Sequence, residues 1–193
     1  MQYPLTKFVT VLRAPHDVAL SLYRHLRGMY VQAYLNGDSA AFDAHFSVDD
    51  IAKVDLGYEE NLVCWLKQAK RRNVLVLFYE DMVADPAKAL NVISDFVGVA
   101  VPRELEADIL QQTSYDNMAK DEAFSNVFAG GGVYGKGRLT LTKDTIEQID
   151  ARWKEKVESA LGYRSYEVMY EEVTGGMFPF PVNDIAYYKT RGM

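Results

Sequence analysis

The sequence predicts an α/β fold in which a parallel β-sheet is flanked by helices. Residues 8–12 (FVTVL) and 74–78 (VLVLF) are short apolar runs, which is typical of strands buried on both faces of a parallel sheet. Each run is followed by a segment whose apolar residues recur at helical spacing. Strands that alternate with helices in this way favour a parallel sheet with helices packed on it.

Length and composition are those of a globular chain with one domain. The 193 residues suffice for a sizeable core, and we expect residues 1–166 to form the domain and 167–193 a C-terminal tail of unknown role. The net charge of −6 argues against general nucleic-acid binding, so an anion site must be a local pocket. The single cysteine, Cys64, fits a reducing compartment and is interpreted as a small buried hydrophobe. With no signal peptide or bilayer-spanning stretch in the sequence, we expect a cytoplasmic protein without membrane partners.

The first strand and the helix after it present two side chains of the types that bind phosphate. Arg13 ends the strand, and ligands of open α/β sheets bind at this edge. Pro15 suits a first helical turn, and Ser21 lies two turns into the helix. A guanidinium fork, a hydroxyl and the helix dipole all favour a phosphate group. A strand-end arginine and a solvent-facing serine fit the same pattern, so this unit alone leaves both interpretations open.

The remaining elements follow from apolar spacing and capping residues. Helices are predicted over residues 59–72, 86–97, 102–112 and 143–161, and Trp65 is expected to pack against the sheet. Ser47 and Asp50 have the spacing of a capping box. Asp85 precedes a helix that starts at a proline and is closed by Gly98, and Gly162 closes the last one.

Four stretches, in this order, resemble the cytosolic-type sulfotransferases. They are RAPHDVALS from Arg13, LVLFYEDMVADPAKALNVISDFVGV around Tyr79, TSYDNM from Thr113 and AGGGVYGKGR, which ends at Arg138. The resemblance implies that the chain uses 3′-phosphoadenosine 5′-phosphosulfate (PAPS) as donor and releases 3′-phosphoadenosine 5′-phosphate (PAP). It also implies a set of donor-binding residues, namely Arg13, Ser21, Tyr79, Thr113, Ser114, Tyr115, Met118, Gly135, Lys136, Gly137 and Arg138. Each stretch by itself also fits a structural role: a strand end, a helix end or a flexible loop.

The resemblance covers the C-terminal two thirds of that family. Its N-terminal strand and phosphosulfate loop, of the type TYPKSGT, and its general-base histidine have no counterpart in this sequence. The catalytic residues are therefore unknown, and His16 is interpreted as a poor substitute for the base. We expect a P-loop-NTPase-like sulfotransferase fold without its first strand, with a gap in the middle of the sheet. The resemblance implies no metal.

The sequence is compatible with three functions. The first is transfer of a sulfuryl group from PAPS to a hydroxyl or amine of a small-molecule acceptor. The second is a module that binds PAP or PAPS without catalysis. The third is a structural role in which a free sheet edge or the C-terminal tail drives self-association into a homo-oligomer.

Overall fold

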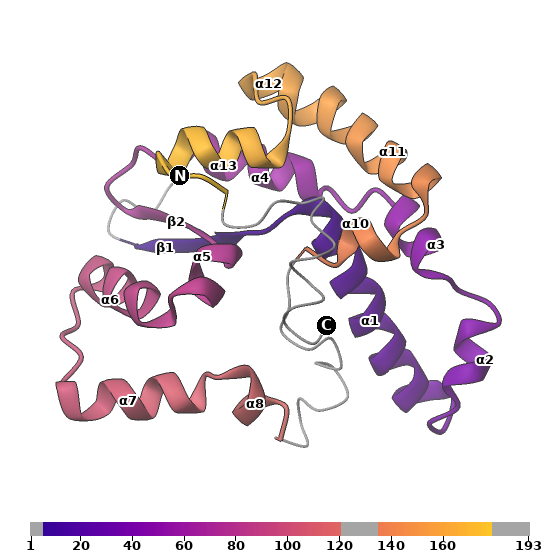
Figure 1. Cartoon of the computed structure of the whole chain (residues 1–193), viewed down its shortest axis with the longest axis horizontal. Helices are drawn as coiled ribbons and strands as arrows, with labels where there is room; N and C mark the ends of the chain where they lie inside the picture. Colours follow the sequence, from indigo (N-terminus) through magenta and orange to yellow (C-terminus); the bar gives the residue numbers. More distant parts are fainter. Residues whose placement is uncertain (1–5, 121–134, 179–193) are drawn as a thin grey trace.

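Two parallel strands form the centre of the protein. The computed structural model describes residues 6–120 and 135–178. Strand β1 (Phe8–Leu12) pairs with β2 (Val74–Phe78), with Phe8 opposite Val74 and Leu12 opposite Phe78 (Figure 1). The two strands therefore end together, and helices surround them. The predicted α/β fold with a parallel sheet flanked by helices is confirmed.

The sheet differs from the expectation in how its strands meet. β1 and β2 are hydrogen-bonded neighbours, so the expected gap does not lie between them. Within the described residues the sheet has these two strands, and each of them has a free outer edge. The turns that follow the two strands consequently lie next to each other at one end of the sheet.

Only one face of β1 is well covered. Phe8, Thr10 and Leu12 are half-buried or buried, whereas Val9 and Val11 are 43% and 46% exposed. Side chains alternate between the faces of a strand, so these two valines share one face. The interpretation of residues 8–12 as a strand buried on both faces was wrong. The main core cluster covers the other face, where α4 (Tyr58–Gln68) and α13 (Tyr166–Thr174) lie (Figure 1).

One of the two predictions made for residues of α4 is confirmed, and the other is wrong. Trp65 packs against the ring of Phe8, with 6.0 Å between ring centroids, as expected. Cys64 is exposed, so its interpretation as a buried hydrophobe was wrong. Successive helical residues are about 100° apart, and Cys64 lies two residues after Leu62, which is completely buried. Cys64 therefore points away from the apolar stripe that contacts the sheet.

The first half of the chain adds a long helix and two short ones. Helix α1 (Pro15–Tyr34) begins at its proline and leaves the end of β1, and α2 (Ser39–Asp43) and α3 (Val48–Lys53) pack beside it. The capping box is confirmed: the Ser47 amide and hydroxyl donate to the Asp50 carboxylate, and the Asp50 amide donates to Ser47 Oγ at 3.2 Å.

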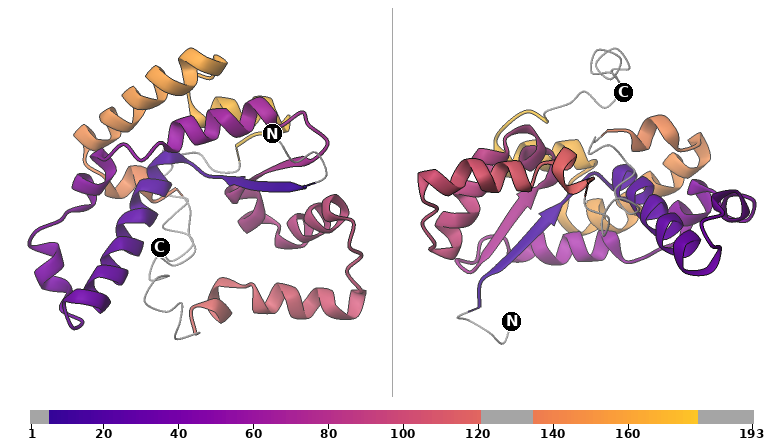
Figure 2. Two further views of the ribbon diagram at one scale, coloured as in Figure 1. Left: turned by 180° about the vertical axis from the view of Figure 1, so that it is seen from behind. Right: turned by 90° about the horizontal axis from the view of Figure 1, so that it is seen from below.

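The helices after β2 lie on the other side of the sheet from α4 (Figure 1). They are α5 (Tyr79–Ala84), α6 (Pro86–Val97), α7 (Arg103–Gln112) and α8 (Tyr115–Met118). Asp85 caps α6 by accepting the Lys88 amide at 2.9 Å, and Gly98 ends it at φ +81°, as predicted. α7 and α8 lie apart from the sheet and from α1 in Figure 1 and in the left view of Figure 2.

A nearly continuous helical rod follows the short helix α10 (Gly137–Thr140). It consists of α11 (Lys143–Trp153), a π-helical stretch η1 (Lys154–Glu158) and α12 (Ser159–Leu161), and it ends at Gly162 with φ +85°. This rod matches the predicted helix 143–161. Lys156 contacts the carboxylates of Asp55 and Glu60, and thereby ties the rod to α4. The two carboxylates raise the pKa of Lys156.

The segment assigned to a C-terminal tail begins as part of the body. Ser165 caps α13, whose Tyr166, Met169 and Tyr170 are buried. They belong to the main core cluster, which also includes Leu12, Leu62, Phe78, Trp153 and Val157. Residues 179–193 lie outside the described residues. No helix in the described ranges is both long and apolar enough to cross a bilayer.

Candidate functional site

Arg13 lies at the carboxyl end of β1 and is held from two sides. Its guanidinium carbon is 4.2 Å from the ring centroid of Tyr79, the residue at the corresponding end of β2. The Tyr58 hydroxyl donates to the Arg13 carbonyl oxygen. Within the described part of the chain the Arg13 Nε is buried and has no hydrogen-bond partner. The structure thus brings together Arg13 and Tyr79, two of the predicted donor-binding residues, and leaves one donor of the guanidinium unused.

Glu80, which was not among the predicted site residues, holds the turn that follows Arg13. Its carboxylate is fully buried, and it accepts the Ala14 amide at 3.0 Å and the Tyr166 hydroxyl at 2.9 Å. Burial raises the pKa of Glu80 more than these two hydrogen bonds lower it. The one available signal in the sequence was a charged residue two positions after the end of a buried strand.

The raised pKa of Glu80 predicts a pH dependence of stability. A carboxyl group of this kind keeps its proton in the folded protein at pH values where the unfolded chain has released it. The free energy of unfolding should therefore fall as the pH rises from about 4.3, the ordinary glutamate value, through the folded pKa. Glu80→Gln should remove this part of the dependence, which lies above about pH 4.3, in urea titrations made between about pH 3 and 8.

Asp150→Asn is the matched control for that experiment. Burial raises the pKa of Asp150, but the nearby His16 and Arg138 outweigh it, so the net shift is downward. Asp150 thus contributes stability above about pH 3.9, and the contribution is lost as the pH falls. The two substitutions should change the pH profile in opposite directions. Equal profiles for Glu80→Gln and the wild type would contradict the prediction.

The glycine-rich segment is docked on the start of α1. The buried Asp17 carboxylate accepts the amides of Gly135 and Gly137, the latter at 2.6 Å. A Cβ atom on Gly137 would lie 2.3 Å from the backbone carbonyl of His16, so this close approach requires glycine. Two amides that we expected to contact phosphate thus donate to a carboxylate of the chain itself. Residues 121–134, including the first glycines of this stretch, lie outside the described residues.

Arg138 is occupied by an ion pair. Its two terminal nitrogens lie 3.3 and 3.1 Å from the carboxylate oxygens of Asp150. His16 is 4% exposed, and its Nε2 is 3.2 Å from the same carboxylate without being aligned for a hydrogen bond. A cavity of about 220 Å³ lies beside this group. His16 is thus largely enclosed by the fold, and its interpretation as a poor general base stays a prediction.

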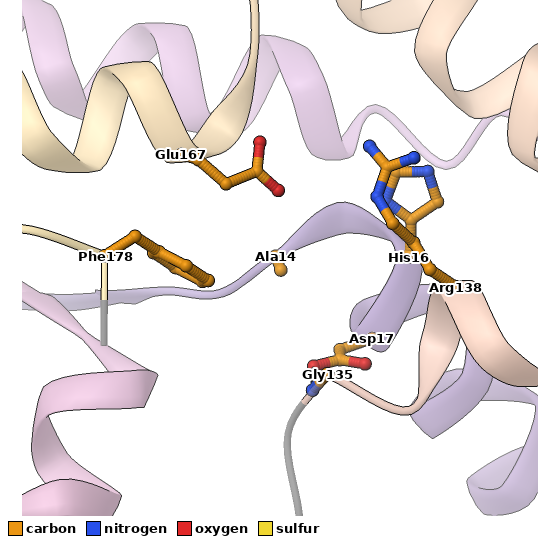
Figure 3. Close-up of a pocket in the computed structure, with 7 residues that line it drawn as sticks. All are labelled: Ala14, His16, Asp17, Gly135, Arg138, Glu167 and Phe178. Carbon is orange, nitrogen blue, oxygen red and sulfur yellow. Dashed lines mark hydrogen bonds between the residues drawn. The ribbon is translucent and has the colours of Figure 1, made fainter. Parts of the chain in front are cut away.

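A second hollow adjoins the turn after β1 (Figure 3). Figure 3 shows Ala14 at its centre, between Phe178 on one side and the side chains of His16 and Arg138 on the other. The carboxylates of Glu167 and Asp17 also line it. These two carboxylates would repel a bound anion, so the hollow is poorly suited to a phosphate group.

The other predicted residues are placed less tightly. Ser21 is exposed on α1, and Lys136 is half-buried before α10. The hydroxyl of Thr113 donates to the Ile109 carbonyl at 2.7 Å, and that of Ser114 donates to the Gln111 carbonyl at 2.7 Å.

The hydroxyls of Thr113 and Ser114 therefore make local contacts at the end of α7. Tyr115 and Met118 are half-buried on α8. The structure does not bring α8 to the cluster around Arg13, because α8 lies apart from α1 and α10 (Figures 1 and 2).

Comparison with known proteins assigns the fold. Mouse sulfotransferase SULT7A1 complexed with PAP superposes with a TM-score of 0.61 at 24% identity, over 89% of this chain and 64% of that one. Retinol dehydratase in complex with androsterone and inactive cofactor PAP gives 0.58 at 21% identity, over 79% of this chain and 47% of that one. At these identities the similarity shows a shared fold.

The sequence comparisons identify the family. Sulfotransferase 1A1 of Canis lupus familiaris is 29% identical over an alignment of 175 residues that covers 82% of this chain and 58% of the dog protein. Sulfotransferase 1A1 of Bos taurus is 26% identical over an alignment of 165 residues that covers 78% of this chain and 55% of the bovine protein. The chain thus spans a little over half the length of these relatives. The sulfotransferase domain family matches residues 2–160. The chain belongs to the sulfotransferase family.

Proposed function

We propose that this chain binds the 3′-phosphoadenosine part of PAPS and serves sulfuryl transfer from PAPS to a hydroxyl or amine of a small molecule. One observation carries the proposal: Arg13 is a strand-end arginine whose guanidinium is fixed by an aromatic ring while its buried Nε has no partner among the described residues. An unsatisfied buried donor on a permanent cation favours an anion such as a phosphate group. Family membership and PAP-bound structures of the same fold support the choice of nucleotide.

The reaction defines what the donor site must do. The bond between sulfur and the bridging oxygen of PAPS breaks, a new bond forms from sulfur to the acceptor oxygen or nitrogen, and the acceptor proton passes to a base. PAP leaves with the electron pair of the broken bond. Such a transfer depends on positioning and on cations near the leaving oxygen. In this proposal Arg13 and Tyr79 hold the nucleotide end of the donor, and the groups that act at sulfur are unassigned.

The remaining predicted contacts form part of the same proposal. Ser21 lies on α1, which begins two residues after Arg13, and Lys136 precedes α10, which packs on α1. In the proposal both would reach the nucleotide as additional polar contacts. Thr113, Ser114, Tyr115 and Met118 would need α8 to approach the sheet, so their role stays a prediction. The cytoplasmic location, the small-molecule acceptor and a homo-oligomer through the free sheet edge also stay predictions.

Thermal unfolding and calorimetric titration with PAP test this proposal. PAP should raise the midpoint of wild-type unfolding by mass action on the folded state. Arg13→Ala should weaken PAP binding by about 10- to 100-fold, the effect of losing charge-assisted hydrogen bonds to a phosphate. Arg13→Lys should recover only part of the affinity, because an ammonium lacks the planar fork. Arg72→Ala, at an exposed arginine before β2, is the matched control and should bind as the wild type does.

Each outcome of this experiment has a clear meaning. Equal affinity of the wild type and Arg13→Ala would contradict the proposed site. Stabilisation by PAP together with sulfation of hydroxyl or amine acceptors in the presence of PAPS would support transfer. Stabilisation without sulfation would favour the binding module, in keeping with the enclosed position of His16 beside Asp150.

A further inference from the structure

Two adjacent residues at the end of β2 hold two adjacent residues at the end of β1. Tyr79 lies against the side chain of Arg13, and Glu80 accepts the backbone amide of Ala14. The register of the parallel sheet explains why these residues meet. Leu12 pairs with Phe78, and both strands end there, so Arg13 and Tyr79 are the first residues beyond the sheet. The orientation of Arg13 therefore depends on the turn that Glu80 holds.

A third element fixes Glu80 itself. The Tyr166 hydroxyl at the start of α13 donates to the second carboxylate oxygen of Glu80, and the Tyr166 ring is buried in the core against Phe78 and Trp153. Both oxygens of Glu80 thus have directed partners from elements far apart in the sequence. The carboxylate bridges β1, β2 and α13 at the point where Arg13 leaves the sheet.

Packing alone would not require a carboxylate at this position. A fully buried carboxyl group costs desolvation energy, and an apolar side chain of similar volume often serves stability as well or better. An apolar side chain supplies no acceptor for the Ala14 amide, which would then lose the hydrogen bond that it makes to Glu80. The directed bond, rather than the burial, is the distinctive contribution of Glu80.

We propose that Glu80 is a positioning residue of the donor site, which sets the direction of the chain after β1 and thereby holds the Arg13 guanidinium where a phosphate group of the nucleotide binds. The inference rests on the proposed function, and it adds a residue to that site. Glu80 acts through Ala14 and Arg13 and does not itself contact the nucleotide.

The neighbouring pair Asp81 and Tyr170 provides a matched control. The Tyr170 hydroxyl donates to the Asp81 carboxylate, so this pair, like Tyr166 and Glu80, joins α13 to the first turn of α5. The hydrogen bonds of Asp81 do not include the Ala14 amide. Variants of this second pair change the stability of α13 packing without touching the turn after β1.

The experiment compares five variants by calorimetric titration with PAP, well below each unfolding midpoint. Glu80→Ala should weaken PAP binding about tenfold, and Tyr166→Phe, which leaves one Glu80 oxygen without its donor, about threefold. Glu80→Gln keeps an acceptor for the Ala14 amide and should restore affinity to within about threefold of the wild type. Asp81→Asn and Tyr170→Phe should bind PAP as the wild type does.

A nucleotide-free measurement separates positioning from general stability. The Tyr79 ring lies over the Arg13 guanidinium, so ring currents should displace the Arg13 Nε–H signal in a ¹H–¹⁵N spectrum, assigned with Arg13→Lys. This displacement should disappear in Glu80→Ala and remain in Glu80→Gln and Tyr170→Phe. A merely structural role would lower the unfolding midpoint of Glu80→Ala and leave both its signal and its PAP affinity unchanged, which would overturn the inference.

The two measurements also distinguish the failures. Absence of PAP binding by the wild type, or equal binding by Arg13→Ala, would contradict the proposed function. If the Arg13 Nε–H signal has the same position in Glu80→Ala as in the wild type, the inference is contradicted whether or not PAP binds. Where Glu80→Ala does not fold, Tyr166→Phe is used for both measurements, the PAP affinity and the Arg13 Nε–H signal, because it removes one hydroxyl and keeps the ring of Tyr166.

Discussion

Gly137→Ala is expected to destabilise the protein by about 3 kcal/mol or more. The new methyl group would meet the backbone of His16 at 2.3 Å and the amide nitrogen of Asp17 at 2.7 Å, and backbone atoms cannot rotate aside as a side chain can. Forcing a group into a packed site costs about 1–3 kcal/mol. Separation of α10 from α1 would also deprive the buried Asp17 carboxylate of its amide partners, which adds a further penalty.

Urea unfolding followed by circular dichroism measures this loss, and thermal unfolding should show a midpoint lower by about 10 °C for a chain of this length. Gly176→Ala is the matched control: a Cβ there meets only the Thr174 hydroxyl at 3.6 Å, so its stability should change by less than about 0.5 kcal/mol. Asp17→Ala should lower the free energy of unfolding less in the Gly137→Ala variant than in the wild type, since both changes release the same contact between α10 and α1. Additive losses, or a harmless Gly137→Ala, would show that α10 does not dock on α1 as described.

Trp153→Ala is expected to cost about 3–5 kcal/mol, the second large effect. Trp153 is 3% exposed in the main core cluster, where its ring packs edge-on against Tyr166. Removal of a large buried aromatic side chain loses its transfer free energy and leaves a cavity. The indole Nε1 also donates to the Tyr163 carbonyl oxygen at 2.8 Å, so the residue joins the helical rod to the start of α13.

Trp153→Phe separates these two contributions. It keeps most of the ring and loses the hydrogen bond to Tyr163, so we expect a loss of about 1–2 kcal/mol. The control is Trp65→Ala. Trp65 is half-buried on α4, so its substitution should lower the free energy of unfolding clearly less than Trp153→Ala does. The free energies of unfolding can be compared by circular dichroism at 222 nm. A larger loss for Trp65→Ala would contradict the assignment of the core.

The candidate site was predictable where local chemistry determines position. Arg13 and Tyr79 each end an apolar strand, and parallel strands place such residues at one edge. Glu80 and Asp17 were missed because their partners are remote. Glu80 binds an amide 66 residues away and Asp17 binds amides 118 and 120 residues away, and neither separation leaves a pattern in the sequence.

The sequence by itself determined the elements whose causes lie within a few residues. The strands follow from their apolar runs, the capping box at Ser47 and the cap at Asp85 from side chains near their own amides, and the helix ends at Gly98 and Gly162 from left-handed backbone angles that suit glycine.

The tertiary structure alone decided which of these elements face each other. It left Val9 and Val11 exposed, turned Cys64 outward, drew α13 into the core and gave the Gly135 and Gly137 amides to Asp17. The physical reason is that burial and hydrogen bonding between distant segments depend on how the whole chain packs, whereas strands, caps and turns depend on the energies of neighbouring residues.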